Sequence, residues 1–70
     1  MARAAINKET GVTTQQERFA AEYVKTGRPS VAYRRAYKTE NMAPSTYYAE
    51  ANRLLNNPIL APRIEHYRKI

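Results

Sequence analysis

Cysteine, tryptophan and aspartate are absent from this 70-residue sequence, which contains only two glycines and one histidine. Without cysteine there are no disulfides and no thiolate metal ligands, and His66 alone cannot form the usual histidine-rich zinc site. The six carboxylates are all glutamates scattered along the chain, so no acid–base pair can be assigned. Gly11 and Gly27 cannot form a glycine-rich phosphate loop. We therefore expect a protein that is not an enzyme and that uses no metal or cofactor.

Long hydrophobic runs are missing as well. No stretch approaches the roughly 18 apolar residues that a membrane span requires. Arg3 and Lys8 are not followed by an apolar segment, so the start of the chain does not resemble a secretory signal. We expect an intracellular protein without membrane contact. A chain of this length allows one domain with a small core, which must come from packed helices, and we predict an all-α domain of about four short helices.

Positive charge is abundant and unevenly distributed. Twelve basic residues against six acidic ones give a net charge of +6. Half of this charge lies between residues 28 and 41, where one acid, Glu40, is outnumbered by Arg28, Arg34, Arg35 and Lys38. A solvated helix face usually mixes the two signs, so this cluster favours contact with phosphates.

The pattern predicts a flexible tail over residues 1–13 and a helical domain over residues 14–70. In the tail, Arg3 and Lys8 could reach a minor groove, although incidental charge on a disordered start is the favoured interpretation. A first helix is expected from Gln15 to Thr26, opened by a capping box of Thr14 and Glu17 and closed by Gly27. Its charges sum to zero, so we assign it a structural role.

A helix-turn-helix is predicted at about residues 30–56. Its first helix would begin at the N-cap Ser30 and run from Val31 to about Tyr37. Its second would begin with Pro44 and bury one stripe, formed by Tyr47, Ala51, Leu54 and Leu55. The opposite face carries short polar groups that match base edges, and we predict base contacts from Ser45, Thr46, Ala49 and Asn52. Core or rim packing is the favoured role of Tyr48.

The remaining predicted contacts are to phosphates. These come from the cations Arg28, Arg34, Arg35, Lys38 and Arg53, of which Arg53 could instead reach a guanine. We expect the guanidinium groups of Arg34 and Arg35 to lie together beside the outer surface of the helix that begins at Pro44. Double-stranded DNA is the partner that this arrangement predicts.

A fourth helix is expected near the end of the chain. Asn57 and Pro58 would start a single turn, and a proper helix would run from about Pro62 to Lys69, since proline within a helix removes a hydrogen bond. The apolar stripe of this segment comprises Ile59, Leu60, Ile64 and Tyr67.

Three segments resemble the small terminase subunits of tailed phages. Residues 14–19 with 22–23 resemble the family's T-x-x-Q-E-x-F-x-x-E-Y opening, and residues 30–37 resemble its T-Q-A-Y-x-x-A-Y helix. Residues 52–58 resemble its S-R-L-L-x-N-P signature, and the likeness extends from Thr14 to about Tyr67. The connector at 38–43 departs from the family in lacking a glycine, and Pro62 interrupts the fourth helix.

The resemblance implies a role in viral genome packaging within the host bacterial cytoplasm. Small terminase subunits bind the packaging site on DNA through an N-terminal helix-turn-helix and deliver the DNA to the large subunit. They commonly assemble as rings through later segments, so we expect this chain to be a DNA-binding domain without the ring-forming part. Two alternatives stay open: a helix-turn-helix transcriptional regulator that binds as a dimer, and a protein-interaction module that presents its tyrosines and leucines without binding DNA.

Overall fold

The predicted all-α fold is confirmed by the computed structural model, which describes residues 10–69. The predictions on Arg3 and Lys8 lie outside the described residues. The described part of the chain forms four helices, which are α1 (Thr14–Thr26), α2 (Pro29–Ala36), α3 (Pro44–Leu55) and α4 (Ala61–Arg68).

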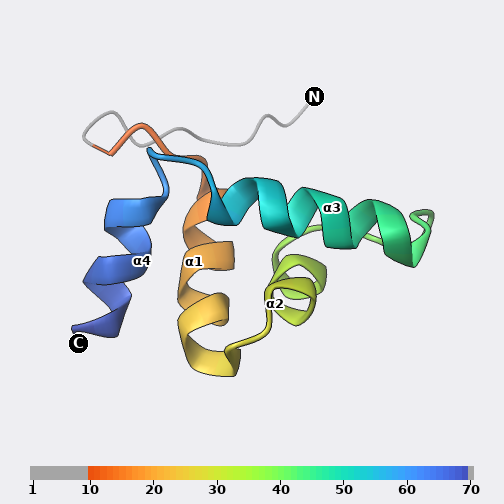
Figure 1. Ribbon diagram of the computed structural model, residues 1–70, viewed down its shortest axis with the longest axis horizontal. Helices are drawn as coiled ribbons and strands as arrows, with labels where there is room; N and C mark the ends of the chain where they lie inside the picture. Colours follow the sequence, from red (N-terminus) through yellow and green to blue (C-terminus); the bar gives the residue numbers. More distant parts are fainter. Residues whose placement is uncertain (1–9, 70) are drawn as a thin grey trace.

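The four helices form a thin body around α1. Helix α4 lies along one side of α1 and α2 packs against α1 on the other side, while α3 crosses steeply over α2 (Figure 1). The principal extents are 32 × 32 × 18 Å. Helix α2 and the N-terminal end of α3 therefore lie away from α4, whereas the C-terminal end of α3 returns over α1 towards α4 (Figure 1).

A small core holds this arrangement together. Its largest fully buried side chains are Phe19 of α1, Leu60 before α4 and Val12 before α1. Ala20, Ala32 and Ala51, one each from the first three helices, are also buried, with Tyr33 and Ile64 completing the cluster. Methyl side chains let neighbouring helices approach closely, so α2 fits between α1 and α3 with little apolar bulk.

The start of α1 differs from the prediction by one residue. Thr13 is the N-cap and forms the capping box with Gln16, each side chain accepting a backbone hydrogen bond of 3.0 Å from the other residue. The expected box of Thr14 and Glu17 is wrong because the Glu17 carboxylate is bound to α4. Val12, which the predicted tail of residues 1–13 includes, is only 2% exposed and lies in the core cluster.

The C-terminus of α1 and the bounds of α2 follow from local backbone chemistry. Gly27 adopts a φ of 70°, which confirms the predicted left-handed cap. Helix α2 begins at Pro29, with Arg28 as N-cap, because the fixed φ of proline suits the first helical position. The prediction of Ser30 as N-cap is therefore wrong, and Tyr37 lies just outside the helix as its C-cap.

The connector between α2 and α3 is longer than in a standard helix-turn-helix. It spans residues 37–43, whereas three or four residues are typical. The Tyr37 ring stacks on Tyr33, with 4.4 Å between ring centroids, and burial raises the pKa of both phenols. This stack anchors the connector to α2. Pro44 opens α3 as predicted.

The segment before α4 forms the single turn that was expected. The Asn57 side chain accepts a hydrogen bond of 2.9 Å from the backbone N–H of Ile59. Pro62 sits in the first turn of α4, where its missing N–H breaks no helical bond. The predicted apolar stripe is wrong for Ile59, which is 52% exposed, because Leu60 takes the buried position.

An ion pair fastens α4 to α1. Two nitrogens of Arg63 donate to the two carboxylate oxygens of Glu17 at 2.9 and 2.7 Å, and the Tyr67 hydroxyl donates to the same carboxylate. Paired, charge-assisted hydrogen bonds of this kind fix geometry better than a single contact. The Arg63 guanidinium holds the pKa of Glu17 below its ordinary value of 4.5.

This pair predicts a pH-dependent stability. Because the pKa of Glu17 is lower in the folded state, its contribution is present above about pH 4.5 and disappears as the pH falls through the folded value. Urea denaturation of wild type and Glu17→Gln should show a less stable variant at pH 7 and a shrinking difference towards pH 3. A difference that is constant with pH would contradict this assignment.

Two neighbouring residues test the core. We expect Leu60→Ala to lower the free energy of unfolding by about 2–5 kcal/mol, since it opens a cavity at a fully buried site. Ile59→Ala, the matched control, should change it by about 0.5 kcal/mol or less. Both values come from chemical denaturation, and equal losses would refute the burial of Leu60 in preference to Ile59.

Candidate nucleic-acid interface

The outer face of α3 is an exposed polar stripe. Residues 45, 48, 49, 52, 53 and 56 recur at intervals of three or four, which places them on one side of the helix, and all are exposed. All four residues predicted to contact bases are exposed, namely Ser45, Thr46, Ala49 and Asn52. The opposite side buries Ala51 and half-buries Tyr47, Leu54 and Leu55. Only one member of the stripe, Arg53, carries a charge.

In the part of the chain that the structure describes, no group bonds to the side-chain amide of Asn52. The contact between Asn52 and Asn56 uses the backbone carbonyl of Asn52, which accepts from the Asn56 amide at 3.1 Å. Arg53, by contrast, lies 3.5 Å from the Glu50 carboxylate, although its side chain is 77% exposed. The stripe therefore presents the amide of Asn52 and exposed hydroxyl groups, together with one partly neutralised cation.

Arg34 joins α2 to this helix. Its guanidinium carbon lies 5.6 Å from the centroid of the Tyr47 ring, a cation–π distance. Tyr47 in turn meets the edge of Tyr48 at 5.1 Å between centroids. Tyr48 is 52% exposed, so the predicted packing role accounts for only part of its surface. Arg34, the half-buried ring of Tyr47 and the exposed ring of Tyr48 are therefore in successive contact where α2 meets α3.

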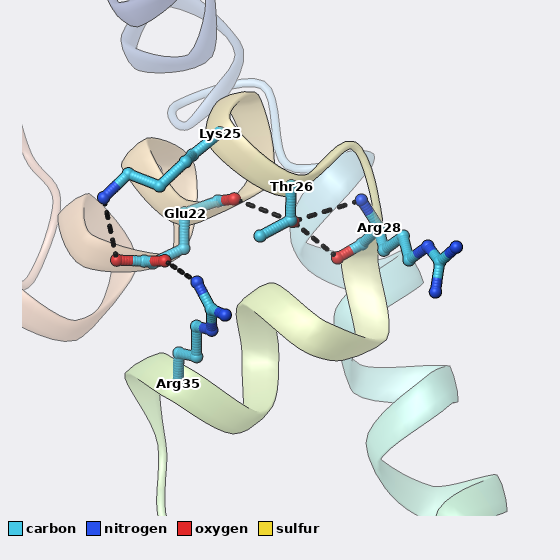
Figure 2. A network of polar contacts seen from close by, with 5 residues as sticks. All are labelled: Glu22, Lys25, Thr26, Arg28 and Arg35. Atoms are coloured by element: carbon cyan, nitrogen blue, oxygen red, sulfur yellow. Dashed lines mark hydrogen bonds and ion pairs between the residues drawn. The ribbon is translucent and has the colours of Figure 1, made fainter.

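The Arg35 side chain is directed to α1 and not to α3. Its Nη1 donates to Glu22 of α1 at 2.9 Å, and Lys25 lies 4.0 Å from the other oxygen of that carboxylate (Figure 2). The hydrogen bond from Arg35 lowers the pKa of Glu22. The expectation that Arg34 and Arg35 lie together beside α3 is therefore wrong for Arg35, whose charge is directed to α1.

Arg28 and Lys38 flank α2 at its two ends. Thr26 fixes the backbone of Arg28, since its hydroxyl donates to the Glu22 carbonyl at 2.8 Å and accepts from the Arg28 N–H at 3.2 Å. The Arg28 side chain extends away from this network (Figure 2). Within residues 10–69, no carboxylate pairs with Arg28, Arg34 or Lys38.

Of the five cations predicted to contact phosphates, two are paired with a carboxylate and three have no acidic partner among residues 10–69. Sequence reasoning missed the pairing of Arg35 because Glu22 lies 13 residues away on another helix. It also missed the Arg34–Tyr47 contact, for which the only signal was the position of both residues on the flanks of adjacent helices.

Most apolar side chains are engaged within the domain. Tyr23, Tyr37, Tyr47, Leu54, Leu55 and Tyr67 all pack against the core cluster. Among the described residues, only Tyr48 and Ile59 are large hydrophobic side chains with high exposure. The tyrosine and leucine faces that an interaction module would present are therefore mostly covered by the protein itself.

Comparison with known proteins shows one similar segment in a longer chain. No family model and no solved structure matches the chain. A protein of Haemophilus influenzae, described only as uncharacterized, is 35% identical over 60 residues. The match covers 84% of this chain but 35% of that protein, so the chain spans about a third of the length of this curated relative.

The described part of the chain contains neither a membrane-spanning helix nor a cluster of metal ligands. No helix of residues 10–69 has the length and hydrophobicity needed to cross a membrane. No group of three histidine or glutamate side chains in that range is placed to hold a metal ion.

Proposed function

We propose that this domain binds double-stranded DNA through α2 and α3. The observation that carries the proposal is a set of three cations, Arg34 of α2 with Arg28 and Lys38 at its two ends, that pair with no carboxylate within residues 10–69. Helix α3, which packs against α2, has an exposed and nearly uncharged polar outer face. Cations that release counterions from phosphates supply affinity, while amides and hydroxyls read base edges. A net charge of +6 attracts the polyanion from a distance.

The phosphate contacts and the base contacts that we propose are assigned to different parts of the surface, as in a helix-turn-helix. Arg28, Arg34 and Lys38 contact phosphates and set the register of the domain on the duplex. Helix α3 enters the major groove, which admits an α-helix, with Ser45, Thr46, Ala49 and Asn52 facing the bases. Arg53 adds a phosphate contact at the far end of α3, and Arg35 contributes only when it leaves Glu22.

The resemblance to small terminase subunits extends this proposal to a biological role. We propose recognition of a viral packaging site in the host bacterial cytoplasm and delivery of that DNA to a large terminase subunit. The resemblance supports this through its three segments, two of which form α2 and the end of α3. A helix-turn-helix regulator would use the same surface, and footprints on natural DNA separate the two, since a dimeric regulator protects paired, palindromic half-sites.

The phosphate role predicts a local effect of charge removal. Arg34→Ala with Lys38→Ala should weaken binding to any 20-base-pair duplex and reduce the slope of log K against log salt by about two units, one for each lost phosphate contact. Fluorescence anisotropy at several salt concentrations measures both quantities.

The matched control removes the same charge from α4. Arg68→Ala with Lys69→Ala also lowers the net charge by two but leaves α2 and α3 intact, so its salt slope should stay close to that of wild type. If both double variants lose affinity equally, overall charge and not this surface accounts for binding.

The Glu22 carboxylate predicts an opposite effect. Glu22→Gln removes the ionic partner of Arg35 and frees its guanidinium for phosphate, so we expect tighter binding and a salt slope steeper by up to about one unit. Glu65→Gln is the control, because it releases Arg68 on α4 in the same way. A similar gain in both variants would show that the position of the freed arginine has no effect.

A further inference from the structure

We propose that α3 recognises A·T base pairs, with Asn52 reading adenine and Ala49 contacting the methyl group of thymine. This specificity rests on the proposed function, since it assigns a base preference to the same helix. It follows from which hydrogen-bonding and apolar groups the outer face of α3 presents and which it lacks.

Asn52 carries the chemistry that matches adenine. Its amide can donate to adenine N7 and accept from the N6 amino group, the bidentate pairing that asparagine makes in the major groove. The side chain is exposed, and no group within residues 10–69 bonds to its amide, since the contact with Asn56 uses the Asn52 backbone carbonyl. The amide is therefore available in full to a base.

Ala49 occupies the middle of the stripe, one turn before Arg53 and between Ser45 and Asn52. It is exposed and presents only a methyl group, so a base edge opposite it gains nothing from hydrogen bonding. The thymine methyl is the apolar group in the major groove, and alanine is one of its usual contacts. A small side chain here also lets the helix backbone come close to the base edges.

On this face, the groups that would select G·C pairs are limited to Arg53, which Glu50 partly neutralises. Guanine is read mainly by arginine or lysine, and the single cation of the stripe, Arg53, lies in the last turn beside Glu50. Cytosine is read by a carboxylate, and Glu50 is half-buried on the flank and paired with that same arginine. Ser45 and Thr46 can bond to either kind of pair and do not discriminate.

The position of Arg34 on α2 explains why a duplex and not another ligand would occupy this face. Arg34 reaches α3 through the Tyr47 ring, and the exposed ring of Tyr48 continues from Tyr47 towards solvent. A positive edge next to a neutral polar face matches the alternation of phosphate backbone and base edges in DNA. Tyr48 would then lie where the groove meets the sugar–phosphate backbone.

Selection from a duplex library tests the inference. A pool of 40-base-pair duplexes with a randomised centre is bound at two salt concentrations, and the bound fraction is sequenced for wild type, Asn52→Ala and Ala49→Ser. Wild type should enrich a motif containing adjacent A·T pairs. Asn52→Ala should lose roughly 5- to 150-fold preference at one A·T position, which corresponds to about 1–3 kcal/mol.

A second measurement isolates the methyl group. Replacing thymine by uracil in the selected duplex removes one methyl per base, so wild type should bind about threefold more weakly when the base opposite Ala49 is changed. Ala49→Ser should bind the two duplexes equally. Both substituted positions are exposed, so the variants should fold as wild type does, and circular dichroism of each variant is the measurement that checks this.

The outcomes separate this inference from the proposed function. Enrichment of G·C pairs, or an unchanged motif in Asn52→Ala, would overturn the A·T assignment. Salt-dependent binding without any enrichment would overturn it too, while leaving duplex binding in place. No binding to any duplex at low salt would overturn the proposed function and the inference together.

Discussion

The fold depends on the burial of very small side chains where its helices meet. A 70-residue chain without disulfides cannot bury a large core, and here an alanine from each of α1, α2 and α3 lies in it beside one phenylalanine. Because the helices approach one another closely, the core needs few large apolar side chains. This close approach also sets the position of α2, because a helix held between two neighbours through Ala32 and Tyr33 must turn its arginines outward. The arrangement of charge on the surface is thus a consequence of packing below it.

Polar contacts between helices add to the stability that this small core provides. They separate the cations considered next into two groups. Arg63 and Arg35 are bound to glutamates of α1, where they tie α4 and α2 to the central helix. Arg28, Arg34 and Lys38 have no such partner in the described range and stay available for a ligand. Positive charge in this protein therefore has two uses, one within the fold and one, as we propose, on DNA.

The helical architecture could be read from the sequence, but its details depend on choices that the sequence leaves open. Apolar spacing, Gly27 and the prolines located four helices correctly. Thr13 with Gln16 and Thr14 with Glu17 fit the capping-box pattern equally well, but Glu17 is bound to Arg63 of α4 and the box forms one residue earlier. Val12 and Ile59 are both branched apolar residues outside the helices, yet Val12 is buried and Ile59 is exposed. The exposure of Asn52 followed from helical periodicity, whereas the pairing of Arg35 required knowledge of how α1 and α2 cross.

The attachment of α4 to α1, on the side away from α2, has a practical consequence. The C-terminal end of α4 and the N-terminal end of α3 lie at opposite sides of the thin body (Figure 1). A linker, a fluorophore or a fused protein joined at the C-terminus would therefore leave the α2–α3 surface open. If the domain were immobilised through that end, the polar outer face of α3 would be exposed to solution in a uniform orientation.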